Sequence, residues 1–161
     1  MNKTGIDKKQ IKKYIFAGII GLTIVFIWSN SFKASDASMN DSNGVKELII
    51  SFFNNFGIDI KNSFFIEFIR KVGHFSEYFI LGAELMLFRI FYLKKGWTSL
   101  INTFYIGVIT AFLDETVQLI PALGRSAEVK DVWIDIFGVA AAFIVVYAFN
   151  KLVRCIKSRK N

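Results

Sequence analysis

The sequence predicts an all-α integral membrane protein with four transmembrane helices and one or two interfacial amphipathic helices between the first and second. The first observation is composition: 53% of the 161 residues are hydrophobic, 18 are Phe, and the mean hydropathy is +0.43. Soluble domains of this size seldom carry so much apolar material. The second observation is that long apolar segments alternate with polar stretches, as in multi-pass membrane proteins. Because no internal repeat or linker interrupts the chain, residues 1–161 are expected to form a single domain.

The four predicted membrane spans differ in how purely apolar they are. The first reads YIFAGIIGLTIVFIW and contains no charged residue. It is shorter than the about 20 residues that cross the hydrocarbon core, but Ile11 and snorkelling lysines can lengthen it. The other three each contain ionisable groups. The predicted spans cover residues 14–29, 73–93, 97–120 and 132–153, and a basic tail covers residues 154–161.

Basic residues indicate which side of the membrane each segment faces. Lysines crowd the start of the chain, Lys94 and Lys95 separate the second and third spans, and Lys and Arg crowd the end. Short segments rich in Lys and Arg stay in the cytoplasm, so both termini are predicted to be cytoplasmic. The external segments, 30–72 and 121–131, contain as many acidic as basic residues. A cleaved secretory signal is the alternative, because SNSFKASDAS follows the first apolar run, but no clear A-x-A site is present.

The external segment 30–72 begins with a stretch rich in Ser, Asn and Asp that is expected to be extended. Two runs follow, VKELIISFFNNF from Val45 and SFFIEFIRKV from Ser63, each with large apolar residues at helical spacing. Such amphipathic helices lie in the membrane interface with their apolar face toward lipid. Alternatively, the aromatic side chains pack on the helical bundle, and the two arrangements can coexist.

Polar and small residues recur on one face of each of the last three predicted spans. Their spacings of three and four residues put them on consecutive turns of a helix. The second and fourth spans start outside and the third ends there, so the ionisable groups are predicted to meet at one depth. The faces consist of His74, Glu77 and Tyr78 in the second span, Thr103, Gly107, Thr110, Asp114 and Gln118 in the third, and Asp131, Asp135, Gly138 and Ala142 in the fourth.

These ionisable groups are predicted to form one outward-facing functional site. Charged groups at membrane depth are costly, and they usually pair with one another around a cavity or pathway. The loop PALGRSAEVKD joins the third and fourth spans on the same side and brings Arg125. The alternative is a structural ion-pair network that holds three helices together. The residues expected in the site are Arg70, Lys71, His74, Glu77, Tyr78, Asp114, Glu115, Gln118, Arg125, Asp131 and Asp135.

The motifs RKVGHFSEYFILG and LDETVQLIPALGRSAEVKDVWIDIFG resemble the VanZ-like family of bacterial membrane proteins. The resemblance covers roughly residues 25–145, with matching order and spacing in three spans. One departure is Pro121, because many members have Pro directly before the Gly124–Arg125 pair. The resemblance implies a location in the bacterial plasma membrane. It also implies a contribution to glycopeptide resistance, since the family is named after an accessory protein that confers low-level resistance to the lipoglycopeptide teicoplanin.

The preferred function is binding, without chemistry, of an anionic or amphiphilic envelope molecule. Arg70, Lys71 and Arg125 would meet the charge of this molecule, and the Phe-rich external helices would meet its lipid part. Membrane lipids, lipid-linked envelope molecules and lipoglycopeptides all belong to this class. Nucleic acid is not an expected partner, because no aromatic platforms lie between the basic ends. The sequence gives no oligomeric state.

Two other functions stay open. One is a membrane-embedded enzyme acting on an outer-leaflet lipid or cell-wall precursor, although no G-x-S-x-G motif is present. Its catalytic candidates are His74, Glu77, Asp114 and Glu115, and its candidates for holding a divalent cation are Asp114, Glu115 and Asp135. The other is an ion or proton pathway, for which Glu84 and Thr103 are the main polar groups toward the inner side.

Overall fold

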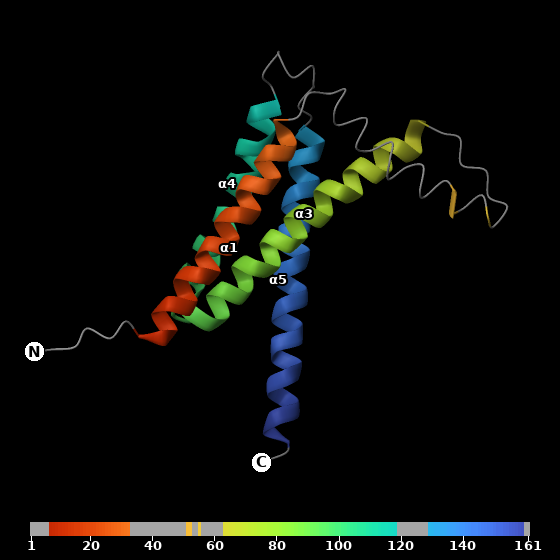
Figure 1. Cartoon of the computed structure of the whole chain (residues 1–161). Helices are drawn as coiled ribbons and strands as arrows, with labels where there is room; N and C mark the ends of the chain where they lie inside the picture. The colour runs from red at the N-terminus through yellow and green to blue at the C-terminus, as the bar shows by residue number, and fades with distance from the viewer. Residues whose placement is uncertain (1–6, 33–50, 53–54, 56–62, 119–128, 160–161) are drawn as a thin grey trace, which may run out of the picture.

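The computed structural model describes residues 7–32, 51–52, 55, 63–118 and 129–159, and all regular secondary structure within these ranges is helical. The four long helices are α1 (Lys8–Ser31), α3 (Ser63–Tyr92), α4 (Trp97–Gln118) and α5 (Val129–Ser158). Figure 1 shows α1 and α4 running along one side of the bundle while α3 crosses α5. The all-helical fold class is therefore confirmed.

Three of these helices, α1, α4 and α5, are long and apolar enough to cross a membrane. The remaining helix, α3, carries charged residues along its length, including Arg70, Lys71, Glu77, Glu84 and Arg89. Such residues lower the mean hydropathy of α3 even where its other side chains are apolar. The protein is thus compatible with a membrane location, and the fourth span stays a prediction.

Helix α3 joins two segments that the sequence analysis treats separately, the surface run from Ser63 and the span 73–93. Gly73 does not break it, because one glycine costs a helix only about 1 kcal/mol and packing can offset that. Its 30 residues extend over about 45 Å, longer than the about 30 Å of hydrocarbon in a bilayer. Figure 1 shows the start of α3 projecting away from the other helices. The first predicted surface run, 45–56, lies outside the described residues except at positions 51, 52 and 55.

The helix ends also extend beyond the predicted spans. Helix α1 begins at Lys8, where the Asp7 side chain caps it by accepting a hydrogen bond from the Lys9 backbone N–H at 3.0 Å. Helix α5 continues to Ser158, through most of the predicted basic tail. A short turn, residues 93–96, joins α3 to α4 and makes them antiparallel neighbours.

Two glycines allow α3 and α5 to cross at very short range. A Cβ atom at Gly82 would lie 2.8 Å from the Val139 Cα, and one at Gly138 would lie 2.6 Å from the Phe75 carbonyl oxygen. Small residues commonly occupy such crossings in membrane bundles, because they let two backbones approach. Helix α4 meets α5 in a similar way, since a Cβ at Gly107 would lie 2.9 Å from a Val139 methyl carbon. These contacts fix how the helices face one another.

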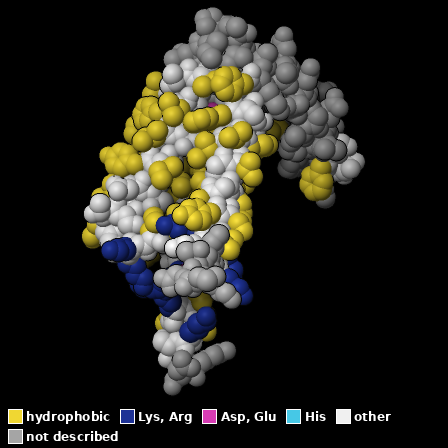
Figure 2. All heavy atoms as spheres, turned by 60° about the vertical axis from the view of Figure 1, so that its left-hand side comes forward, with side chains coloured by type: hydrophobic (Ala, Val, Ile, Leu, Met, Phe, Trp, Pro, Cys, Tyr) yellow, Lys and Arg dark blue, Asp and Glu magenta, His cyan; other side chains and the backbone are white. Residues whose placement is uncertain are grey.

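Apolar side chains fill the centre of the bundle and also cover much of its outside. The buried core includes Tyr78, Leu81, Leu85 and Val139. Figure 2 shows large hydrophobic side chains across the visible face, which suits contact with lipid, and basic side chains toward the lower end. The start of α1, the α3–α4 turn and the end of α5, where Lys and Arg concentrate, lie toward this same end of the bundle.

Adding a methyl group at the α3–α5 crossing should destabilise the protein. We expect Gly138→Ala to lower the free energy of unfolding by about 1–3 kcal/mol, because the two backbones must separate. Gly73→Ala is the matched control, since no atom lies within 4 Å of a Cβ there and alanine favours the helix. Thermal melting in detergent measures both. Equal melting temperatures for the Gly138→Ala variant and the wild type would contradict the close crossing.

Candidate functional site

The most buried polar groups lie where α3, α4 and α5 meet. His74 of α3, Asp114 of α4 and Asp135 of α5 each offer an atom that could ligate a metal ion, and these atoms all lie within 4.8 Å of one another. The His74 Nδ1 is 3.7 Å from the Asp135 Oδ1. Both aspartates are fully buried, while the His74 side chain is 14% exposed. Gly138 lies almost one turn after Asp135, so the close α3–α5 approach brings this aspartate to His74.

A second ionic contact lies one turn away along the same two helices. Arg70 precedes His74 by four residues, Asp131 precedes Asp135 by four, and the Arg70 Nη2 is 3.6 Å from the Asp131 Oδ2. Residues four apart lie on the same face of a helix. One relative placement of α3 and α5 therefore brings both pairs into contact. Arg70 is 34% exposed, so this pair contributes little stability, but it puts a cation at the more open end of the site.

The remaining predicted residues surround these pairs. Tyr78 is fully buried and interacts electrostatically with Asp114 and Asp135. The Glu77 Oε1 accepts a hydrogen bond from the Asn30 side chain of α1 at 2.8 Å. The Gln118 side chain donates to Glu115 at 3.2 Å on α4, and Lys71 on α3 is half-buried.

Acidic groups outnumber basic ones in the part of the site that the structure describes. Asp135 interacts electrostatically with Asp114, Glu115, Asp131 and Glu77. Among described residues, neither carboxylate oxygen of Asp135 accepts a hydrogen bond. Gathering like charges away from water is costly unless a proton or a cation offsets them. The inner part of the site therefore suits a cation, whereas Arg70 and Lys71 can attract an anion to its outer part.

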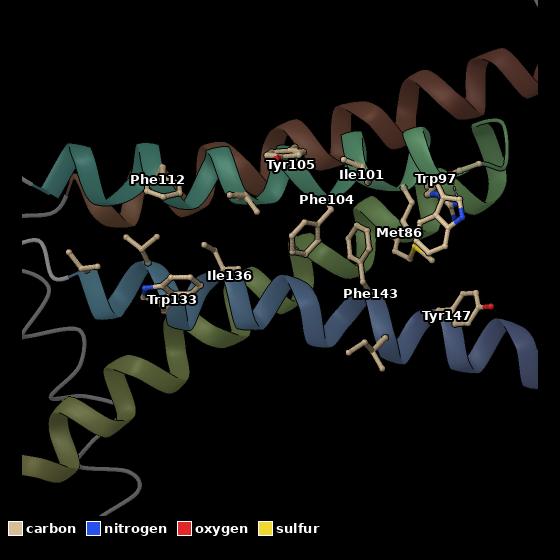
Figure 3. A pocket seen from close by; sticks show the side chains of 17 residues that line it. Met86, Trp97, Ile101, Phe104, Tyr105, Phe112, Trp133, Ile136, Phe143 and Tyr147 are labelled. Atoms are coloured by element: carbon tan, nitrogen blue, oxygen red, sulfur yellow. Dashed lines mark hydrogen bonds between the residues drawn. The ribbon is translucent and has the colours of Figure 1, made fainter.

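A groove of about 1330 Å³ lies between α4 and α5, open along one side of the bundle. Its lining is almost entirely apolar and rich in aromatic rings (Figure 3). Phe104 and Phe143 stack edge to face within it, with ring centroids 5.4 Å apart. Phe112 and Trp133 lie toward one end, and Trp97 lies toward the other (Figure 3). Apolar pockets of this kind take the apolar part of a ligand.

The groove reaches the helical turns that carry the polar site. Phe112 precedes Asp114 by two residues, and Val132 and Ile136 immediately follow Asp131 and Asp135. Glu115 follows Phe112 by three residues and lies one turn further along α4, toward the polar site. An elongated molecule in the groove would thus have its end near a site carboxylate.

A family model described as VanZ/LLP1 matches residues 16–150 of the chain. The chain belongs to the VanZ/LLP1 family. This confirms the resemblance drawn from the polar motifs. No curated protein and no solved structure matches the chain.

The VanZ/LLP1 match includes all the predicted site residues. The structure brings together residues of the three predicted polar faces, and it joins His74, rather than Glu115, to the aspartates of the candidate metal group. Glu115 is bonded to Gln118 instead. Arg125, together with the rest of residues 119–128, lies outside the described residues, so its predicted place in the site stays a prediction.

The sequence analysis missed the contribution of α1 to the site. Asn30 bonds to Glu77, and further along the same helix the Thr23 hydroxyl donates to Glu84 at 3.0 Å. The signal for Asn30 is the polar WSNS at the end of the first apolar run, but this marks only where the span ends. It does not reveal which helix the side chain faces. The groove was also missed, because its apolar residues look the same in sequence as lipid-facing ones.

Removing the hydrogen bond between Asn30 of α1 and Glu77 of α3 should destabilise the protein without changing its net charge. We expect Asn30→Ala to lower the free energy of unfolding by about 1.5–3 kcal/mol, because a hydrogen bond to a carboxylate is lost. Ser29→Ala is the control, since the Ser29 hydroxyl is exposed and bonds to the Phe26 carbonyl of its own helix. Melting in detergent compares the two variants. Equal losses for both would mean that the bond to Glu77 contributes nothing specific.

Proposed function

We propose that this VanZ/LLP1 protein binds an amphiphilic envelope molecule from the outer side of the plasma membrane. The charged headgroup would lie at the polar site, and the apolar part would lie in the groove between α4 and α5. The observation that carries the proposal is that an almost wholly apolar groove ends on the same helical turns as a buried polar cluster. A membrane lipid, a lipid-linked envelope molecule and an acylated glycopeptide all have the required two-part chemistry.

The dimensions of the groove support an acyl chain as the apolar part. On α4 the lining extends from Trp97 to Phe112, which is about 22 Å along the helix axis. One leaflet contributes about half of the 30 Å hydrocarbon thickness, so a chain from the outer leaflet fits within this length. Aromatic rings provide large apolar contact surfaces along the path.

Arg70 and Lys71 support a headgroup that carries negative charge. Arg70 is partly exposed and lies one turn from the His74–Asp135 pair, at the end of the site that is more open. A guanidinium presents a planar set of donors that matches phosphate or carboxylate. The deeper carboxylates would repel an anion, which favours a headgroup held at the outer part of the site.

The distribution of charge supports an outward-facing site. Basic residues concentrate where α1 begins, where α3 turns into α4 and where α5 ends, which fits the cytoplasmic side. The polar site lies toward the opposite ends of α4 and α5. Both termini would then be cytoplasmic, and α3 would serve as the fourth span.

The packing favours binding over an ion or proton pathway. Past Tyr78, the buried side chains of α3 in the described part of the chain are the apolar Leu81, Leu85 and Met86. The buried Thr103 and Thr110 of α4 donate their hydroxyls to carbonyls of their own helix. Glu84 is bonded to Thr23 of α1. A contribution to glycopeptide resistance follows if the bound molecule is teicoplanin itself or an envelope amphiphile that alters its action.

Cysteine labelling tests the proposed topology. In a Cys155→Ser background, Ser126→Cys should react with an impermeant thiol reagent in intact cells, and Lys95→Cys should react only after permeabilisation. The natural Cys155 is exposed at the basic end and should behave like position 95. The measurement is the extent of labelling before and after permeabilisation. Labelling of position 95 but not 126 in intact cells would reverse the orientation and move the site inside.

Photo-crosslinking tests the groove. Protein reconstituted with phosphatidylglycerol that carries a photoreactive acyl chain should be labelled on α4 and α5 at groove residues. Val108→Trp should reduce this labelling several-fold because Val108 lines the groove, whereas Ile109→Trp on the adjacent, exposed position should not. Mass spectrometry locates and quantifies the crosslinks.

Two comparisons complete this experiment. Arg70→Gln should weaken labelling by phosphatidylglycerol more than labelling by the zwitterionic phosphatidylcholine carrying the same chain, because only the former has net charge. If Val108→Trp and Ile109→Trp reduce labelling equally, the crosslinks report general contact with lipid, and the proposed acyl-chain site is wrong.

A further inference from the structure

We propose that His74, Asp114 and Asp135 bind one first-row divalent cation, with Zn²⁺ and Mn²⁺ as the fitting ions. The site lies inward of the Arg70–Asp131 pair, at the junction of three helices. This inference goes beyond the binding of an envelope amphiphile and does not depend on it, because it rests on the three side chains alone.

The separation of the three side chains suits a single ion. Zinc binds His nitrogen and carboxylate oxygen at about 2.0–2.2 Å, so two of its ligands can be at most about 4.4 Å apart. The candidate ligand atoms lie within 4.8 Å of one another, and the His74 Nδ1 is 3.7 Å from the Asp135 Oδ1. Small side-chain rotations would bring all three within range. Each ligand comes from a different helix, so the ion would also link α3, α4 and α5.

The surroundings of Asp135 independently favour a bound cation. Its side chain is 0% exposed, and neither carboxylate oxygen accepts a hydrogen bond from any described residue. The His74 Nδ1, at 3.7 Å, is beyond hydrogen-bond distance. A buried carboxylate normally has a hydrogen-bond donor, a cation or a metal ion against it. The carboxylates of Asp114, Glu115 and Glu77 also repel a negative charge on Asp135, which makes a compensating cation more favourable.

The donor set selects the type of ion. Imidazole suits Zn²⁺ and other first-row metals, whereas Mg²⁺ and Ca²⁺ prefer sites made wholly of oxygen. Two carboxylates and one neutral histidine give three protein ligands and offset the charge of a divalent ion. Three protein ligands leave a coordination position open for water or for an oxygen of a bound molecule. A phosphate could take that position, which would reconcile an acidic site with an anionic headgroup.

Metal analysis of the purified full-length protein in detergent tests the inference. After removal of metal and titration with Zn²⁺ or Mn²⁺, we expect one equivalent to bind to the wild type and to raise its melting temperature. His74→Gln and Asp135→Asn should each weaken binding at least tenfold and abolish the thermal shift. Glu84→Gln is the control, since Glu84 is a half-buried acid on α3 that is bonded to Thr23, away from the three ligands. It should bind metal like the wild type.

Replacement with Co²⁺ provides a second readout, because the visible absorption bands of this ion report its ligands. The wild type and Glu84→Gln should give bands that His74→Gln changes or removes. Should Asp135→Asn fail to fold, the partly exposed His74 still allows the decisive comparison. Substoichiometric binding by the wild type, or unchanged affinity and spectra in His74→Gln, would overturn the site. Because no lipid is present, this result is independent of the crosslinking experiment on the groove.

Discussion

The close crossing of α3 and α5 is the constraint on which the rest of the structure depends. Gly82 and Gly138 remove the side chains that would hold the two backbones apart, since a methyl group at either would meet backbone atoms at less than 3 Å. A membrane offers little hydrophobic driving force for helix association, so close van der Waals packing has to supply it. The crossing therefore stabilises the bundle and sets the rotation of both helices.

The polar site is a direct consequence of that crossing. With Gly138 against α3, the preceding turns of α5 present Asp135 to His74 and Asp131 to Arg70. Packing that favours the fold thus brings together carboxylates that repel one another. Asn30 and Gln118 satisfy part of this cluster through hydrogen bonds to its glutamates. A cation at the aspartates would relieve the remaining repulsion, and in that sense binding and folding would favour the same arrangement.

The groove arises from how α4 is positioned. Gly107 lets α4 approach Val139 of α5 closely, while bulky aromatic residues line the space beside this contact. The polar cluster faces the inside of the bundle, and the groove opens along its side, with Glu115 on the turn that links them. Under the proposed function, a molecule with one charged end and one apolar chain would use both features. The family match supports a shared architecture for the region, without naming that ligand.

The sequence by itself determined the helical class, the apolar segments and the helix faces on which the polar residues lie. It could do so because the hydropathy of a segment depends only on that segment's own residues. Spacings of three and four residues likewise place Asp131 and Asp135, or Asp114 and Gln118, on one face of their helix. Only the tertiary structure decided that α3 is continuous from Ser63, that Asn30 reaches Glu77, and that an apolar groove adjoins the site. Periodicity fixes where a residue lies around its own helix, but the crossing angle and rotation between helices come from side-chain packing, which decides which faces meet.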